Sequence, residues 1–375
     1  MHRKDPCPVR ATEGWVQMYK LGTRKWRPNN KKALALQSKT GDFALTTIPL
    51  LRPGRGEVLV KVQAAALNPI DWKMQGYGWF IQEYPSVIGS DIAGDIVGIG
   101  EGVTDLVICD RVLFAGAFAN TKGQGTAGFQ QYTRTDIYSL SKIPPALTLV
   151  EASTIPAAIS TAYVGLYSPE PLGAGYEAPS VKDAQNKYNG VPIAILGGSS
   201  SVGQLVIQLA HLSGFNPIIT TSSLKHAEFL KSLGATHVLD RLLTHSETIS
   251  AVKDIIGDTP LKLIYAAISN DETQKLGLDL VAPGGHLIIT LYPTIETQDG
   301  KKVIHVHALK SLPQNIAILR EMHIKLTEWL KEGLIKPNRV EILDNGLSGV
   351  VDGLERLENN KVSGVKLVAL PQVNA

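Results

Sequence analysis

A short apolar strand that runs straight into a glycine- and serine-rich loop is the feature that most constrains how this chain folds. The apolar run occupies residues 193–196, and the loop after it reads Gly197-Gly198-Ser199-Ser200-Ser201. A helical pattern follows at once, because apolar residues recur at spacings of three and four from Val202 to Leu212. A buried-type strand joined to a helix in this way is typical of a parallel sheet with helical crossovers. We therefore expect an α/β domain here.

The alternation of strand and helix continues beyond this first unit. Further strand-like apolar runs lie at residues 218–221, 237–239, 263–266 and 286–290. The helical stretches between them lie at residues 225–233, 249–256 and 272–281. Parallel strands joined by right-handed crossovers build a doubly wound sheet. The sequence thus predicts five parallel strands.

The chain before residue 157 has a different pattern. Short β-type runs, such as residues 58–62 and 96–99, are separated by Gly and Pro turns, which indicates an all-β domain. The region at residues 168–189 is rich in Pro, Gly and charge and lacks periodicity. We expect a basic, disordered leader at residues 1–31, a β domain at residues 32–156 that the C-terminal residues 335–375 rejoin, and the α/β domain at residues 157–334 with a loop insertion at residues 168–189.

Charge and composition narrow the range of partners. A net charge of +3 over 375 residues favours neither nucleic acid nor a membrane, and no apolar run approaches the roughly 20 residues that span a bilayer. We expect a monomer or homodimer that takes a small molecule. Cys7 and Cys109 are too few for a disulfide framework and fit a reducing, cytoplasmic compartment. The Arg-rich, acid-poor leader keeps a mitochondrial transit peptide as the alternative.

The glycine-rich loop predicts a dinucleotide site. Glycines let the backbone approach a pyrophosphate closely, and the free N–H groups at the positive end of the helix dipole attract it. The expected contacts are Gly197, Gly198, Ser199, Ser200, Ser201, Val202 and Gly203. Their spacing departs from the common G-x-G-x-x-G form, so a tight turn without a ligand is the alternative. The array of βα units around the loop favours the dinucleotide.

The end of the second α/β strand indicates which dinucleotide binds. An enzyme that uses NAD places an Asp or Glu there, roughly 20 residues beyond the loop, to bind the ribose 2′-hydroxyl. Residues 220–225 contain no carboxylate, whereas Ser222, Ser223 and Lys225 can donate to a 2′-phosphate. NADPH is therefore the expected cofactor. The alternative is that the two serines only cap the following helix.

Several motifs, in order along the chain, resemble the medium-chain dehydrogenase/reductase superfamily. Besides the loop, they are Asn68-Pro69-Ile70-Asp71-Trp72-Lys73, Gly89-Ser90-Asp91, Asp110-Arg111-Val112 and the segments at residues 53–60, 156–166 and 346–368. The resemblance implies a GroES-like β domain built from both chain ends, a Rossmann domain, and a cofactor cleft between them. Within the superfamily, the chain is similar to zinc-less fungal reductases labelled alcohol dehydrogenases and to trans-acting enoyl reductases of polyketide synthesis.

The resemblance also bears on metal binding. Zinc-dependent members hold their catalytic zinc with a Cys and a His in the two segments where this chain has Asn68 and Ser90. An amide and a hydroxyl do not replace a thiolate and an imidazole as zinc ligands. His305 and His307 alternate in a strand-like stretch, and we interpret them as surface residues rather than ligands. We expect no metal site.

Reduction of an enone or enoyl group leaves negative charge on the carbonyl oxygen and requires a proton at the α-carbon. The resemblance implies that Tyr77 donates this proton and that Lys73 lies beside cofactor and substrate. The alternatives are an aromatic that only packs and a solvated lysine. The resemblance also implies Asn68 as a residue of the nicotinamide pocket. The other cofactor residues that it implies are Thr161, Leu291, Val362 and Ser363.

The expected function is the NADPH-dependent, zinc-independent reduction of an enone, enoyl or quinone double bond. One alternative is a non-catalytic NADPH-binding sensor or structural protein, because binding alone requires only the loop and the serines. The other is a trans-enoyl reductase that depends on a partner and acts on carrier-bound polyketides. A basic surface would favour that second alternative, since the carrier's phosphopantetheine is anionic.

Overall fold

The computed structural model describes residues 29–117, 125–179, 187–297 and 300–373. The basic leader predicted at residues 1–31 therefore lies outside the described residues, apart from its last three positions. Strand β1 begins at Asn30, two residues before the predicted start of the β domain.

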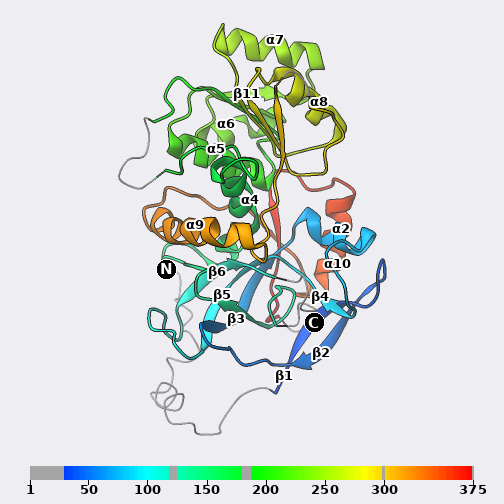
Figure 1. Cartoon of the computed structure of the whole chain (residues 1–375). Helices are drawn as coiled ribbons and strands as arrows, with labels where there is room; N and C mark the ends of the chain where they lie inside the picture. Colours follow the sequence, from blue (N-terminus) through cyan, green and yellow to red (C-terminus); the bar gives the residue numbers. More distant parts are fainter. Residues whose placement is uncertain (1–28, 118–124, 180–186, 298–299, 374–375) are drawn as a thin grey trace. The chain divides into compact units, whose positions relative to one another are not determined.

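The chain divides into two compact units, which Figure 1 colours along the sequence. Among the described residues, unit 1 runs to Pro156 and resumes at Val340–Lys361 and from Leu367 onward, and unit 2 comprises Ala157–Arg339 and Val362–Lys366. Unit 2 thus extends five residues beyond the predicted limit at residue 334, and it includes a short piece of the C-terminal segment. Arg339 links the two additions, because its carbonyl oxygen accepts from the N–H of Lys366 at 2.7 Å and its Nε donates to the carbonyl oxygen of Gly364 at 3.2 Å.

Unit 1 consists mainly of antiparallel strands. One sheet has the order β2-β1-β4, formed by β2 (Phe43–Pro49), β1 (Asn30–Leu36) and β4 (Ser86–Val87). The other has the order β15-β16-β3-β5-β6-β8, with β7 also paired to β3. Its strands are β15 (Val340–Ile342), β16 (Lys366–Ala369), β3 (Glu57–Ala66), β5 (Asp91–Ile99), β6 (Arg111–Ala115), β8 (Ser141–Lys142) and β7 (Tyr132–Asp136). The helices of unit 1 within the described residues are α2 (Pro69–Tyr77), α3 (Leu149–Ala152) and α10 (Gly349–Glu358).

The long strand β3 organises the core of unit 1. Its Val58, Val60 and Val62 are fully buried, as β-branched residues that face a core should be. A Cβ atom at Gly94 of the neighbouring strand β5 would lie 2.1 Å from the carbonyl oxygen of Lys61, so only glycine lets β3 and β5 come this close. The predicted β domain that the C-terminus rejoins is present, since β16 pairs with β3.

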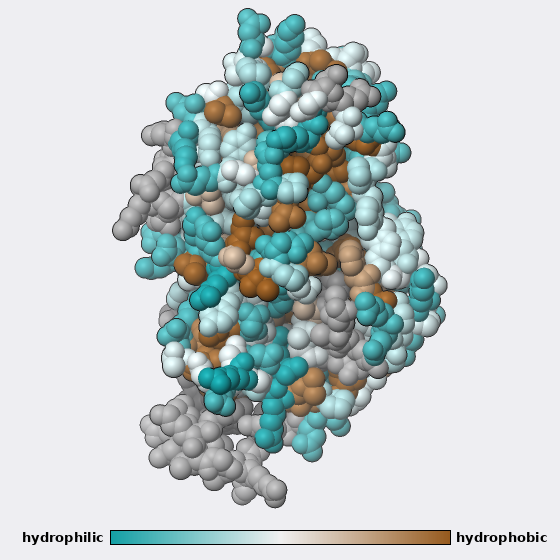
Figure 2. Space-filling view, in the orientation of Figure 1, coloured by the Kyte–Doolittle hydropathy of each residue, from teal (hydrophilic) through white to brown (hydrophobic). Residues whose placement is uncertain are grey.

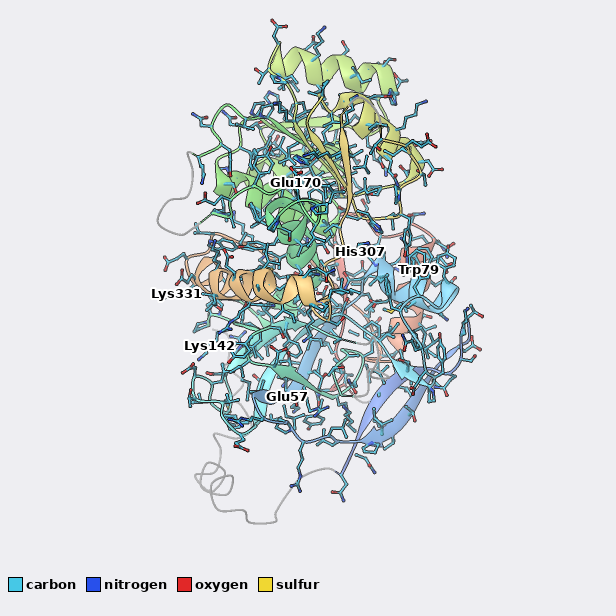
Figure 3. All side chains as sticks on the ribbon, viewed as in Figure 1. Glu57, Trp79, Lys142, Glu170, His307 and Lys331 are labelled. Atoms are coloured by element: carbon cyan, nitrogen blue, oxygen red, sulfur yellow. The ribbon has the colours of Figure 1, made fainter. Side chains whose placement is uncertain are left out.

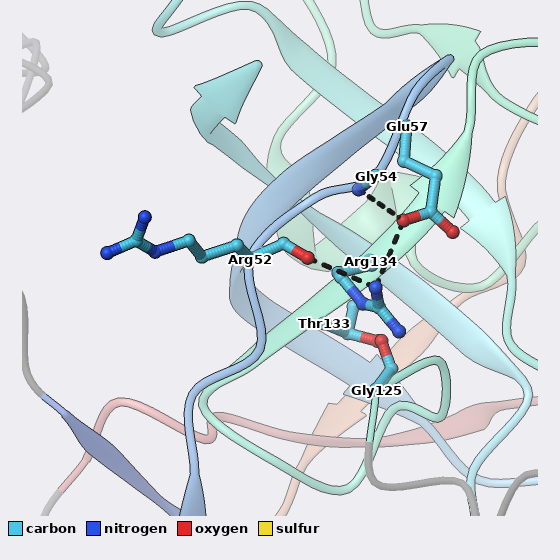
Figure 4. Close-up of polar contacts among 6 residues, drawn as sticks. All are labelled: Arg52, Gly54, Glu57, Gly125, Thr133 and Arg134. Carbon is cyan, nitrogen blue, oxygen red and sulfur yellow. Dashed lines mark hydrogen bonds and ion pairs between the residues drawn. The ribbon is translucent and has the colours of Figure 1, made fainter. Parts of the chain in front are cut away.

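A charged contact secures the turn that leads into β3 (Figure 4). Arg134 Nη1 donates to Glu57 Oε2 at 3.1 Å and to the carbonyl oxygen of Arg52 at 3.0 Å. Glu57 Oε2 also accepts the backbone N–H of Gly54 at 2.7 Å. Nearby, Thr133 Oγ1 donates to the carbonyl oxygen of Gly125. One guanidinium thus ties strand β7 to the Pro53-Gly54 turn before β3.

Unit 2 is built around a six-stranded parallel sheet of order β11-β10-β9-β12-β13-β14. Its strands are β11 (His237–Asp240), β10 (Ile218–Ser222), β9 (Ile193–Leu196), β12 (Leu263–Ala266), β13 (His286–Ile289) and β14 (Lys302–His305). The predicted doubly wound sheet is confirmed, with the strand order 3-2-1-4-5-6 of a Rossmann domain. The sixth strand, β14, was not among the five predicted strands, because it is only four residues long and begins with a lysine.

Helices and loops complete unit 2. The helices are α4 (Pro156–Tyr167), α5 (Ser201–Ser213), the 3₁₀ turn η1 (Leu224–His226), α6 (Ala227–Ser232), α7 (His245–Ile256), α8 (Asp271–Leu280) and α9 (Pro313–Lys331). Glu170, labelled in Figure 3, anchors the start of the predicted insertion. Its carboxylate accepts from His286 Nε2 at 2.7 Å and from Lys302 Nζ at 2.5 Å, at the amino ends of β13 and β14.

One expectation drawn from composition needs correction. Residues 149–167 are long and apolar enough to cross a membrane by length and composition alone, although 72% of that stretch is buried in the structure, as in a core helix of a soluble protein. The face shown in Figure 2 is mostly hydrophilic, with small scattered hydrophobic areas.

Candidate functional site

The loop after β9 has a shape that only glycine permits. A Cβ atom at Gly198 would lie 2.1 Å from Thr220 Oγ1, and one at Gly203 would lie 2.4 Å from the carbonyl oxygen of Gly197. Gly197 itself has φ of 89°, in the left-handed region that glycine favours. The loop therefore packs tightly against both the next strand and the first turn of α5, which leaves its outer side open to a phosphate.

The serines of the loop have different tasks. Ser200 is the N-cap of α5, where its Oγ accepts the N–H of Gly203 at 3.0 Å and donates to the carbonyl oxygen of Gly197 at 2.8 Å. Its hydroxyl thus serves the loop itself. Among the described residues, the backbone N–H groups of Ser199, Ser201 and Val202 have no backbone acceptor. They are the donors that an anion at this helix terminus would use.

The end of β10 carries a buried hydroxyl that lacks a partner. Ser222 is 2% exposed, and its Oγ makes no hydrogen bond to the described residues. Ser223 is the N-cap of η1, but its side chain makes no capping hydrogen bond. The structure therefore does not support the alternative that Ser222 and Ser223 only cap the following helix. Lys225 is exposed two residues further on.

This site also contains three basic residues that the sequence analysis did not predict: His226, Arg241 and Arg339. Arg241 follows β11, and its backbone N–H donates to the carbonyl oxygen of Ser222 at 2.9 Å. Arg339 Nη2 donates to His226 Nδ1 at 2.9 Å, and its guanidinium lies 4.2 Å from the ring centre of Phe229. Burial, and then the charges of Arg339, Lys225 and Arg241, lower the pKa of His226. Of the three, only Arg241 could have been found from the sequence, because it directly follows strand β11 at this edge of the sheet.

The short C-terminal piece of unit 2 reaches the same site. Because Arg339 donates to Nδ1, His226 carries its proton on Nε2 and donates it to Ser363 Oγ at 3.1 Å. Arg339 Nε also donates to the carbonyl oxygen of Gly364 at 3.2 Å. Ser363, which the resemblance implied as a cofactor residue, is thus hydrogen-bonded to the residue that follows Lys225. Val362 begins the same piece.

Two further predicted residues lie elsewhere in unit 2. Thr161 in α4 donates its hydroxyl to the carbonyl oxygen of Ala157 at 2.8 Å, and its own carbonyl oxygen accepts from Tyr265 Oη at 2.8 Å. Leu291 follows β13, at the carboxyl edge of the sheet where open α/β folds present their ligands.

The predicted catalytic residues of unit 1 lie on and before helix α2. The backbone N–H of Asn68 donates to Asp71 Oδ2 at 2.7 Å, which starts the helix. Asn68 Nδ2 donates to Ser90 Oγ at 3.0 Å and to Asp91 Oδ2 at 2.9 Å. Both amide N–H groups are thus engaged, so Asn68 ties α2 to β5 rather than offering a free donor.

Lys73 lies among aromatic rings. Its Nζ is 5.4 Å from the ring centre of Trp72 and 5.9 Å from that of Trp79, which Figure 3 labels. The ring of Tyr77 lies 5.9 Å from Trp72 and 5.2 Å from Trp79. Burial lowers the pKa of Lys73. The structure therefore brings Lys73 and Tyr77 into one cluster, where an amine and a phenol can both donate protons.

The positions that hold zinc in relatives contain no such ligands here. Asn68 and Ser90 are hydrogen-bonded to each other, as described above. Among the residues that the structure describes, no group of three or more His, Cys, Asp or Glu side chains is arranged to hold a metal ion.

Family models match both units. The alcohol dehydrogenase GroES-like domain matches residues 54–145, and the zinc-binding dehydrogenase family matches residues 201–321. A trans-enoyl reductase of Aspergillus japonicus, himH, is 33% identical over 317 residues, which cover 83% of this chain and 89% of the relative. The dehydrogenase azaJ of Aspergillus niger is 31% identical over 360 residues, 91% of this chain and 99% of the relative.

Solved structures share the fold. An alcohol dehydrogenase superfamily protein from Novosphingobium aromaticivorans has a TM-score of 0.74 at 21% identity, covering 90% of this chain and 99% of its own. The quinone oxidoreductase from Coxiella burnetii has a TM-score of 0.67 at 23% identity, covering 90% and 98%. Enoyl and quinone reductases of this kind bind nicotinamide dinucleotides, which the glycine-rich loop fits. Because relatives above 30% identity align over nearly their whole length, the chain belongs to the medium-chain dehydrogenase/reductase superfamily of oxidoreductases.

Proposed function

We propose that this protein uses NADPH to reduce an activated double bond in an enone, enoyl or quinone substrate. The observation that carries the choice of NADPH is the end of β10, where Ser222 Oγ is buried without a partner beside the exposed cations Lys225 and Arg241. The neighbouring carboxylate, Asp240, is engaged with the backbone N–H of Leu242 at 3.1 Å. A 2′-phosphate supplies the negative charge that such a cluster lacks.

The residues of unit 2 then have separate roles in binding. The N–H groups of Ser199, Ser201 and Val202, with the dipole of α5, hold the pyrophosphate. Lys225 and Arg241 offset the charge of the 2′-phosphate, and Ser223 donates to it. The bound dinucleotide supplies a hydride for the substrate. Thr161, Leu291, Val362 and Ser363 remain proposed cofactor contacts on the basis of family resemblance.

Unit 1 supplies the proton. Tyr77 Oη is the proposed donor of the proton to the α-carbon of the substrate, and Lys73 is a second proton donor in the same cluster. Burial lowers the pKa of Lys73, which makes its ammonium a better donor near neutral pH. Asn68 contributes by holding α2 in place.

Binding measurements on charge variants test the cofactor assignment. A hydrogen bond to a charged group contributes about 1.5–3 kcal/mol, so Lys225→Ala and Arg241→Ala should each weaken NADPH about tenfold or more and leave NADH affinity unchanged. Lys231→Ala is the matched control, because Lys231 is exposed on α6 and pairs with Glu228 at 3.0 Å. Equal affinity of the wild-type protein for NADPH and NADH would contradict the assignment.

A trans-enoyl reductase acting on carrier-bound polyketides is the second candidate, and it is favoured because the relatives himH and buaC are named trans-enoyl reductases. The relative buaC, from Petromyces alliaceus, is 27% identical over 370 residues, 93% of this chain and 99% of its own. Turnover of an enoyl-pantetheine thioester that exceeds turnover of simple enones and quinones would select this candidate. NADPH binding without turnover of any of the three would select the non-catalytic sensor.

The remaining proposals concern binding partners, metal content and cellular location. We propose a zinc-independent monomer or homodimer in the cytoplasm, with a mitochondrial location as the alternative because of the basic leader, and with neither nucleic acid nor membrane as partner. Elemental analysis of the purified active protein should find less than stoichiometric zinc. Activity that is lost with a chelator and restored by zinc would contradict the zinc-independent proposal.

A further inference from the structure

Three rings stand together at one edge of the unit 2 sheet. Tyr292 follows β13, and its ring centroid lies 4.9 Å from that of His305, the last residue of β14. The ring centroids of His305 and His307 are 4.1 Å apart; Figure 3 labels His307. Ile289 pairs with His305 in the parallel register, so the three rings lie beyond the carboxyl ends of the strands. The sequence interpretation of both histidines as surface residues holds only for His307, because His305 is partly buried.

This edge is also the one that bears the glycine-rich loop. The loop follows β9, and β13 and β14 are the second and third strands away from it in the order β9-β12-β13-β14. At about 4.8 Å per strand, the rings therefore stand roughly 10–14 Å along the edge from the pyrophosphate loop. Open α/β sheets bind their ligands along this edge. A ligand that extends from the loop along this edge of the sheet would pass the three rings.

Two buried amide side chains hold the backbone that carries the rings. Gln274 Nε2 donates to the carbonyl oxygen of Tyr292 at 3.0 Å, and Gln274 Oε1 accepts the N–H of Thr294 at 2.9 Å. Asn315 Nδ2 donates to the carbonyl oxygen of His307 at 2.6 Å. Both amides are 1% exposed. Buried side chains that fix two loop segments by hydrogen bonds are typical of a preorganised site.

The imidazoles of His305 and His307 each have a ring N–H that can donate a hydrogen bond. Within the described part of the chain, the side chains of His305 and His307 make no hydrogen bond. Burial, and then the neighbouring His307, lower the pKa of His305 to about 4. His305 is therefore a neutral imidazole at neutral pH, with one N–H that can donate and no charge that needs a carboxylate.

We propose that His305 and Tyr292 form an oxyanion-binding site, which donates hydrogen bonds from a neutral imidazole and a phenol to an enolate or phenolate oxygen on a flat conjugated ligand. This inference rests on the proposed function and deepens it, because reduction of an enone or quinone places negative charge on such an oxygen. The exposed rings of Tyr292 and His307 offer the faces against which a flat ligand packs.

The test uses 4-nitrophenol, whose visible absorbance distinguishes the phenol from the phenolate, titrated into the full-length protein. An oxyanion site favours the phenolate, so binding should lower the apparent pKa of the probe by about one unit, a tenfold preference for the anion. His305→Leu should abolish this shift, whereas His305→Gln should retain most of it, because the glutamine amide still donates an N–H. Tyr292→Phe keeps the ring and should remove part of the shift.

His237→Gln is the matched control, since His237 is exposed and begins β11 at the opposite edge of the sheet. The same variants should lower kcat with an enone about a hundredfold for His305→Leu and leave the affinity for NADPH unchanged. A wild-type protein that does not favour the phenolate, or a His305→Leu variant with the wild-type shift and kcat, overturns the oxyanion site. Failure of the wild-type protein to oxidise NADPH with any substrate instead overturns the proposed function.

Discussion

Ser222 shows how one side chain can indicate a ligand. A buried hydroxyl without a partner costs about 1–3 kcal/mol relative to one that is hydrogen-bonded. Lys225 and Arg241, which follow β10 and β11, are exposed, and within the described residues neither forms an ion pair with a carboxylate. The proposed 2′-phosphate would meet both deficits at once. That shared solution, more than any single contact, is why NADPH is the proposed cofactor.

His305 makes the stability of the protein depend on pH. Its pKa is about 4 in the folded state and 6.5 in the unfolded state. The unfolded chain therefore binds more protons between these values, and stability must fall as pH drops from about 6.5 towards 4. His305→Gln has no such titration, so its melting temperature should fall less than that of the wild type over this range. Parallel melting curves for the two proteins would contradict a neutral, partly buried His305.

The strand, loop and helix from β9 to α5 act as one element. Gly198→Ala would place a methyl group 2.1 Å from Thr220 Oγ1, so the loop or β10 must shift. We expect a loss of about 1–3 kcal/mol in the free energy of unfolding by urea, and weaker binding of both NADPH and NADH, because the loop holds the part that they share.

Gly76→Ala is the control for this substitution. Gly76 lies in α2, and a Cβ atom there would meet nothing within 4 Å. Alanine should stabilise the helix by about 0.5–1 kcal/mol, because it restricts the unfolded chain more than glycine does. If Gly198→Ala and Gly76→Ala have the same effect on stability and on binding, the conclusion that the loop is tightly packed at Gly198 is wrong.

At the scale of the whole molecule, the local patterns were predictable and the long-range ones were not. Residues 193–203 predicted β9, the loop and α5, because strand, turn and helix signals are all local. The edge strand β14 was missed, since its apolar run is only two residues long. The cluster of His226, Arg339 and Ser363 joins residues more than 100 positions apart in the sequence, and no local pattern reports such a contact.

The same distinction applies to the catalytic residues. Helix α2 was not predicted within the β domain, although Asn68 and Asp71 have the spacing of a helix N-cap and its N3 carboxylate. The aromatic surroundings of Lys73 could have been anticipated from the four aromatic residues at positions 72–80. The oxyanion site could not, because Tyr292 and His305 are brought together only by the pairing of β13 with β14.

Transfer of deuterium from the cofactor to the substrate tests the central claim most directly. The protein is incubated with an enone and NADPH that carries deuterium on the transferred position of its nicotinamide ring, and the product is analysed by mass spectrometry and NMR. We predict one deuterium at the β-carbon of the product, and a rate that falls when NADH replaces NADPH. A product without deuterium, or no product from enone, enoyl thioester or quinone, would contradict an NADPH-dependent reductase.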